Sequence, residues 1–150
     1  LTLKMTKQDT EIEAAVQAAL QYHPKADCRI LQFIETFRRG TGNKPDNQKI
    51  IRTLFLAGYC YYFAIMLKDA FPEGEICWAA PFGHIVFVQN GIPYDIEGVY
   101  CGEADAFIPV WYMGETINDF RHVPGVECNA TEQQIAQIMV KYQEEKYQRN

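Results

Sequence analysis

The dipeptide Asn90-Gly91 places the tightest constraint on how this chain folds. It separates two runs, 84–89 and 92–97, that are rich in Ile, Val, Phe and Tyr. Asn-Gly between two such runs is the strongest short-range signal of a β-hairpin, because both residues of the two-residue turn must take a positive φ. We therefore expect the two runs to pair as antiparallel strands in one fixed register.

That register puts His84 opposite Glu97 and Val86 opposite Asp95. Because side chains alternate between the two faces of a strand, these four share one face, while apolar residues such as Ile85 occupy the other. His84 and Asp95 are diagonal neighbours there, within reach of each other. An acid beside an imidazole fixes its tautomer and stabilises its protonated form. The hairpin thus predicts a His–acid pair, with Asp95 as the acid, or Glu97 if the register of the turn slips.

The rest of the pattern predicts helices around a small sheet. A further strand is expected at 75–80, and helices at 11–23, 28–39, 48–56, 59–71 and 131–148. The segments 106–114 and 119–123 fit either a short helix and a strand or two strands. A chain of 150 residues has the usual size of one domain. We expect one α+β domain, residues 1–150, with helices packed on a small antiparallel sheet.

Several residues have the chemistry of helix ends. Asp9 or Thr10 is expected to cap the first helix and Asp27 the second, which Gly40 is expected to end. Thr131 and the Gln three residues later fit a capping box at the start of the last helix.

Composition excludes several classes of partner. The net charge of -5 argues against a nucleic-acid-binding surface, which needs clustered Lys and Arg. No apolar run reaches the roughly 18 residues that cross a bilayer, and the first ten residues lack the apolar stretch of a signal peptide. Five cysteines without a C-x-x-C pair indicate a reducing, cytoplasmic setting. Secretion stays open, since Leu1 is not an initiator Met.

Cys60 stands apart from the other cysteines. It lies at the start of the segment 59–71, directly after Gly58-Tyr59. The segment is apolar nearly all round, which predicts a buried helix. The N–H groups at a helix start favour a thiolate and can bind a developing oxyanion, so a cysteine there is a better nucleophile than a free one.

A nucleophilic Cys that opens a buried helix, a His that starts a later strand and an acid on the next strand resemble the papain-like cysteine peptidase superfamily. The order of these pieces is similar to that of its transglutaminase-like and NlpC-type branches. The matching segments are GYCYYFAIML around Cys60, FGHIVFVQNG around His84 and IPYDIEG around Asp95, about 40 residues in the middle of the chain.

The resemblance implies a papain-like fold in which a central helix carries the Cys, and a cysteine hydrolase or acyltransferase that acts on an amide or peptide bond through a thioester. It implies Cys60 as nucleophile, His84 as base and Asp95 as orienting acid. The substrate would contain a peptide or amide, a protein included, and no cofactor or metal is expected. No residue before Cys60 clearly matches the side chain that completes the papain oxyanion hole; Asn47 and Gln48 are the candidates.

Two other functions fit the same residues. Cys60, His84 and Asp95 can supply three ligands to a zinc ion, which would make the chemistry metal-assisted hydrolysis. Alternatively, the chain is a catalytically inactive papain-like scaffold that binds a protein partner, with Cys60 unreactive and His84 distant from it. The other histidines are expected to be structural, His23 at a helix end and His122 bonded to backbone near a turn.

Overall fold

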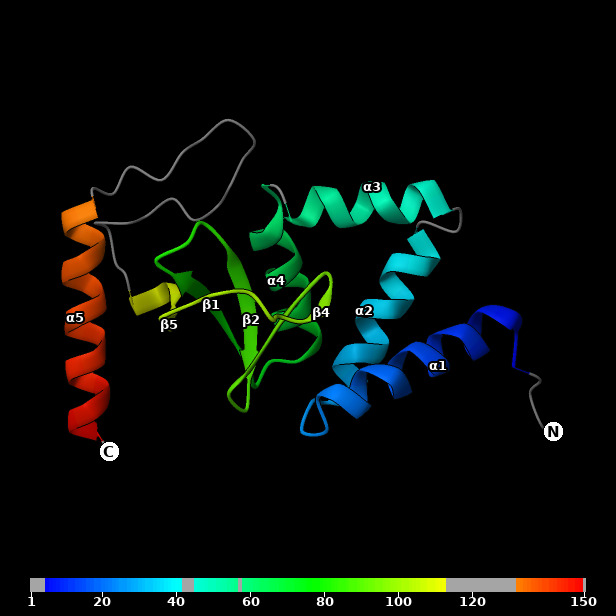
Figure 1. The fold of residues 1–150 in the computed structure, drawn as a ribbon, viewed down its shortest axis with the longest axis horizontal. Helices are drawn as coiled ribbons and strands as arrows, with labels where there is room; N and C mark the ends of the chain where they lie inside the picture. Colours follow the sequence, from blue (N-terminus) through cyan, green and yellow to red (C-terminus); the bar gives the residue numbers. More distant parts are fainter. Residues whose placement is uncertain (1–4, 42–44, 57, 113–131, 150) are drawn as a thin grey trace.

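The computed structural model describes residues 5–41, 45–56, 58–112 and 132–149. In these ranges it has α1 (Lys7–Tyr22), α2 (Cys28–Thr41), α3 (Pro45–Leu56), α4 (Cys60–Ala70), β1 (Glu75–Ala80), β2 (Ile85–Gln89), β3 (Ile92–Asp95), β4 (Gly98–Val99), β5 (Ala106–Pro109) and α5 (Glu132–Arg149). Figure 1 shows α4 beside the sheet, α1 to α3 on the β4 side, and α5 beyond β5. The expected α+β class is confirmed.

The hairpin around Asn90-Gly91 has the predicted register. Phe87 pairs with Tyr94 and Gln89 with Ile92, which is the pairing of a two-residue turn. Both turn residues have positive φ, 51° for Asn90 and 78° for Gly91. The Asn90-Gly91 turn was therefore sufficient to predict the register of β2 and β3 correctly.

Besides the three strands expected at 75–80, 84–89 and 92–97, the sheet has β4, which was not expected, and β5, which lies in the ambiguous segment 106–114. Its five strands are all antiparallel and run in the order β4-β3-β2-β1-β5. The short β4 follows β3 after a turn and pairs with it, and β5 pairs with β1 at the opposite edge of the sheet. Of the two ambiguous segments, 106–109 is a strand and 110–112 a turn of 3₁₀ helix, while 119–123 lies outside the described residues.

The first two helices show how far the capping predictions hold. Thr6, and neither Asp9 nor Thr10, caps α1: the Thr6 side chain accepts the N–H of Asp9, and Asp9 bonds back to the N–H of Thr6. This reciprocal capping box satisfies two N–H groups at once, which explains why the helix starts earlier than expected. Asp27 caps α2 as predicted, with Oδ1 2.8 Å from the N of Arg29.

Gly40 does not end α2 as predicted. It lies inside that helix, which continues to Thr41. Glycine costs a helix about 1 kcal/mol relative to alanine, a cost that tertiary packing can offset. The expected cap at Thr131, like His122 and Cys128, lies outside the described residues.

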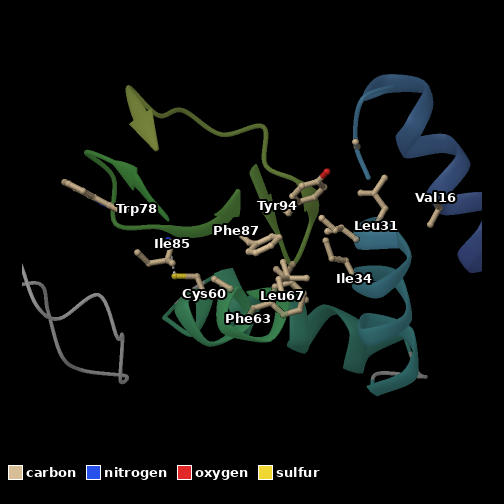
Figure 2. Packing of buried hydrophobic residues seen from close by; sticks show 14 of the residues in the cluster. Val16, Leu31, Ile34, Cys60, Phe63, Leu67, Trp78, Ile85, Phe87 and Tyr94 are labelled. Carbon is tan, nitrogen blue, oxygen red and sulfur yellow. Dashed lines mark hydrogen bonds between the residues drawn. The ribbon is translucent and has the colours of Figure 1, made fainter. Parts of the chain in front are cut away.

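The core is formed by α4 and the sheet, with buried residues of α1 and α2 in the same cluster. Figure 2 shows the side chains of α4 directed toward those of β2 and β3. The buried positions of α4 follow the spacing of one helical face, and they are Cys60, Phe63, Ala64 and Leu67. Their partners in the same cluster include Ile85, Phe87 and Tyr94.

The other side of α4 is partly exposed. Tyr62 and Ile65 are 37% and 39% exposed. The expectation of a helix buried nearly all round is therefore wrong, because the sheet covers one face of α4. No single helix in the described ranges is long and apolar enough to cross a membrane, although α3 and α4, bent by 97° between Asn47–Leu56 and Cys60–Ala70, reach that size together.

Candidate functional site

Cys60 is the first residue of α4, and the backbone before it turns sharply. Gly58 has a φ of 124°, which residues with side chains rarely adopt, although a Cβ at this position would meet no atom within 4 Å. Glycine is thus needed here for backbone conformation and not for space. The N-cap residue, Tyr59, makes no side-chain hydrogen bond to the first turn. The start of α4 is therefore not blocked by a capping side chain.

The thiol of Cys60 lies against β2. Its Sγ accepts a hydrogen bond from the N–H of Ile85 at 3.4 Å, the contact marked by a dashed line in Figure 2. The residue is 4% exposed. An N–H donor at this sulfur stabilises negative charge on it.

His84 and Asp95 form the pair that the hairpin predicts. The Nε2 of His84 lies 2.9 Å from Oδ2 of Asp95, and the two side chains are 14% and 6% exposed. Because Asp95 occupies Nε2, the ring nitrogen left to face a thiol is Nδ1.

The carboxylate of Asp95 is fixed at both oxygens. While Oδ2 binds His84, Oδ1 accepts the N–H of Glu97 at 2.8 Å. Asp95 also pairs across its turn with Gly98, whose φ of 107° suits glycine. Rotation of the carboxylate would break one of these bonds, so the turn sets its direction.

Glu97, the alternative acid, has a different partner. Its two oxygens bind Arg52 of α3 at 2.7 and 2.8 Å. Next to it, the carbonyl oxygen of Ile96 accepts a hydrogen bond from Arg38 of α2 at 3.1 Å. Helices α2 and α3 thus bind the turn that follows Asp95 through these two arginines. Glu97 is engaged by Arg52, so the acid beside the imidazole is Asp95.

The electrostatics of His84 follow from these contacts. Burial by itself lowers the pKa of His84, but hydrogen bonds with Asp95 and with Cys60 outweigh it and raise the pKa to about 9. The imidazole is therefore protonated at neutral pH. The structure thus brings Cys60, His84 and Asp95 together from α4, the start of β2 and the end of β3.

The two residues suggested for an oxyanion hole lie elsewhere. Asn47 and Gln48 are in the first turn of α3, whereas Cys60 follows the last. At about 1.5 Å per residue, the length of α3 separates them from the thiol. Gln48 instead borders a cavity together with Lys7, Glu11 and Arg39. The N–H groups at the start of α4 are the donors nearest to the thiol in sequence.

The other described cysteines have different surroundings. Cys28 and Cys101 are exposed, and Cys77 is buried in β1, where burial raises the pKa of its thiol to about 12. Cys101 Sγ lies 3.6 Å from Nε2 of His23, which ends α1 as expected. Of these four thiols, Cys60 and Cys77 are thus buried and the other two exposed. Among the described residues, no group of three His, Cys, Asp or Glu side chains is arranged to hold a metal ion.

Sequence reasoning missed Tyr100. Its ring lies over the imidazole of His84, with centroids 5.2 Å apart and planes tilted by 37°. Tyr100 follows the two-residue strand β4, in a stretch with neither helical nor alternating periodicity, so no pattern pointed to it.

The described residues define an α+β protein with a Cys–His–Asp cluster on a five-stranded antiparallel sheet. A family model for the phage YunG-like protein matches residues 34–146, about three quarters of the chain. The chain belongs to this phage YunG-like family, and the matched range contains all three residues of the cluster. Comparison with curated proteins and with solved structures finds no match.

Proposed function

We propose that this chain is a papain-like cysteine hydrolase or acyltransferase that acts on amide or peptide bonds. Cys60 is the nucleophile, His84 the base and acid, and Asp95 the residue that orients the imidazole. The papain-like assignment is supported by a helix that begins with the Cys and packs on an antiparallel sheet carrying the His and the Asp.

One observation carries the proposal: the bond between Asp95 and Nε2 of His84 at 2.9 Å. It orients the imidazole and leaves Nδ1 as the nitrogen that can serve the thiol, and this orientation is the role of the third residue in a triad. The nearness of Cys60 to His84, which also raises the pKa of the imidazole, supports the same arrangement.

The chemistry follows from these positions. Because His84 is protonated at neutral pH, the reactive form of the site is the Cys60 thiolate beside the His84 imidazolium. The thiolate attacks the carbonyl carbon, and the C=O electron pair moves to an oxygen that N–H groups at the start of α4 can bind. Collapse of this intermediate breaks the C–N bond, the leaving amine takes the proton from His84, and a thioester remains on Cys60. Water or a second amine, deprotonated by His84, then attacks the thioester and releases the thiolate.

A second candidate is a catalytically inactive scaffold that binds a protein partner. The burial of Cys60, which is 4% exposed, favours it, because a nucleophile must meet its substrate. Trp111, 67% exposed, is the kind of large aromatic side chain found in binding surfaces.

Thiol alkylation separates the two candidates. We would measure the rate at which iodoacetamide labels Cys60 between about pH 5 and 9, in a background in which the exposed Cys28 and Cys101 are Ser, and locate the label by mass spectrometry. The triad predicts labelling well below the ordinary thiol pKa of about 8.5. We expect His84→Ala to abolish this advantage and Asp95→Asn to slow labelling at least tenfold, because the imidazole loses its orientation.

Glu97→Gln is the matched control. It keeps the backbone N–H that binds Asp95 and removes only the charge that faces Arg52, so labelling of Cys60 should be unchanged. If Cys60 labels only when the protein unfolds, the catalytic proposal fails and the scaffold is the better account. If Glu97→Gln and Asp95→Asn slow labelling equally, Asp95 is not the orienting acid.

A further inference from the structure

The ring of Tyr100 covers His84, and four features hold it there. Its N–H donates to the carbonyl oxygen of Pro93 at 2.8 Å, and its hydroxyl donates to the carbonyl oxygen of Glu103 at 3.0 Å. The ring of Phe107 meets it edge to face, with centroids 6.3 Å apart. The backbone of Gly102 is the fourth feature.

Gly102 leaves the space in which the Tyr100 ring lies. A Cβ at position 102 would be 2.4 Å from the hydroxyl oxygen of Tyr100 and 2.5 Å from Cζ, far inside contact distance. No positive φ demands glycine at this position, in contrast to Gly58 and Gly98. Glycine is therefore needed at position 102 because the Tyr100 ring lies so close to its backbone. A residue with a Cβ would displace that ring.

Behind Tyr100 is a cavity of about 540 Å³. Tyr100 and Asp95 both line it, together with Val99 and Cys101. The Tyr100 ring thus packs on the His84 imidazole at the edge of a space large enough to hold water. Burial, followed by the negative charges of Asp95 and Glu103, raises the pKa of Tyr100, so the ring stays uncharged at neutral pH.

We propose that Tyr100 is a positioning residue that keeps water from the cavity away from the His84–Asp95 hydrogen bond, and that Gly102 is required for its placement. A hydrogen bond between charged groups is stronger and better oriented where water does not compete for it. The effect on Cys60 chemistry rests on the proposed function, whereas the exclusion of water does not.

Three titratable groups among the described residues face His84. They are Asp95 from β3, Cys60 from α4 and Tyr100 itself. Removing the ring would ease the burial that lowers the pKa of His84 and also weaken the bond to Asp95 that raises it. These two changes shift the pKa of His84 in opposite directions, so the pKa is a poor measure of the effect of Tyr100. The rate at which the Nε2–H proton of His84 exchanges with water is the better measure.

The test follows the Nε2–H proton of His84 by NMR. In the unchanged chain we expect a downfield resonance protected from exchange with water, and in Tyr100→Ala exchange at least about tenfold faster. Tyr100→Phe keeps the ring and should keep the protection. Gly102→Ala should speed exchange as Tyr100→Ala does, and the double variant should show little further change, because both act through the same ring. Cys77, which is buried, should stay unlabelled by iodoacetamide in every variant that remains folded.

Unchanged exchange in both Tyr100→Ala and Gly102→Ala would overturn the proposal, as would equal loss of protection in Tyr100→Phe. The alkylation rate of Cys60, measured on the same variants, separates this proposal from the catalytic one. If Cys60 is unreactive in the unchanged chain while exchange responds to Tyr100, the proposed function fails and the positioning role stands. If Cys60 is reactive but neither proton exchange at His84 nor alkylation of Cys60 changes in the Tyr100 variants, the proposed function stands and the positioning role fails.

Discussion

At the scale of single residues, His84 is the group whose surroundings matter most. Its Nε2 is bound to Asp95, and the nearby thiol of Cys60 on α4 also raises its pKa. Both contacts favour the protonated imidazole, and together they overcome a burial that favours the neutral one. A buried histidine held in its charged form makes the free energy of unfolding depend on pH.

We therefore expect a pH-dependent stability that can be assigned to His84. Its pKa is about 9 in the folded chain, above the ordinary 6.5, so the stabilisation is complete below pH 6.5 and is lost as the pH rises through 9. The free energy of unfolding should fall by about 2–3 kcal/mol over that range. Urea unfolding at several pH values would measure it, with His84→Gln as the comparison. Parallel pH profiles for the two proteins would contradict the assignment.

At the scale of elements, the sequence predicted best where local chemistry decides the structure. The Asn90-Gly91 turn set the register of β2 and β3, and that register placed His84 beside Asp95. Prediction failed where distant contacts decide. The two strands at the sheet edges, β4 and β5, are short and take their definition from pairing with β3 and β1. Periodicity cannot find such strands, because a run of two to four residues carries almost no pattern.

The candidate site shows the same division. Cys60, His84 and Asp95 were predictable because a helix start and a hairpin have fixed geometry. Tyr100 reaches His84 through a loop whose path depends on Gly102 and on backbone contacts, and these are invisible in a single sequence. The exposed side of α4 was missed for a related reason: apolar composition shows that a helix can be buried, not how much of it is covered.

The two faces of α4 lead to a prediction about stability. Leu67 is fully buried against the sheet, whereas Ile65, two residues earlier, is 39% exposed. Leu67→Ala should lower the free energy of unfolding by about 2–5 kcal/mol, because it leaves a cavity in a packed core. Ile65→Ala, which removes a side chain of the same size, should cost about 1 kcal/mol or less. Urea unfolding of both variants would decide, and equal losses would show that the outer face of α4 is covered as well.

At the scale of the whole molecule, α1 and α2 share the hydrophobic core with the sheet, and polar contacts around β3 add to this packing. Arg38 and Arg52 hold the turn that follows Asp95. One residue before Asp95, the hydroxyl of Tyr94 accepts a hydrogen bond from the N–H of Asp27 at 2.8 Å. The strand that carries the acid of the candidate site is thus attached to the helical part of the protein on both sides of Asp95, at Tyr94 and in the turn that follows. A change in how α2 packs would therefore move Asp95 relative to Cys60.

Asp27 is the best place to test this attachment. Its Oδ1 caps α2, and its Oδ2 accepts a hydrogen bond at 3.0 Å from Gln89 of β2, which is 5% exposed. In Asp27→Ala the cap is lost and a buried amide donor loses its partner, so the free energy of unfolding should fall by about 2–4 kcal/mol. Asp27→Asn keeps an acceptor and should recover most of that loss.

Arg29→Ala is the matched control. It removes the ion pair with Asp27, but the Arg29 side chain is 65% exposed, and such pairs contribute about 1 kcal/mol or less. The hydrogen bond from the Arg29 side chain lowers the pKa of Asp27 more than burial raises it, and the bonds from the Arg29 backbone N–H and from Gln89 lower it further. The Asp27 contribution should therefore be present above its ordinary pKa of 3.8 and be lost as the pH falls below it. If Asp27→Ala cost no more than Arg29→Ala, the link between α2 and the sheet would lie elsewhere. If it also slowed alkylation of Cys60 while Arg29→Ala did not, the packing of α2 would be coupled to the position of Asp95.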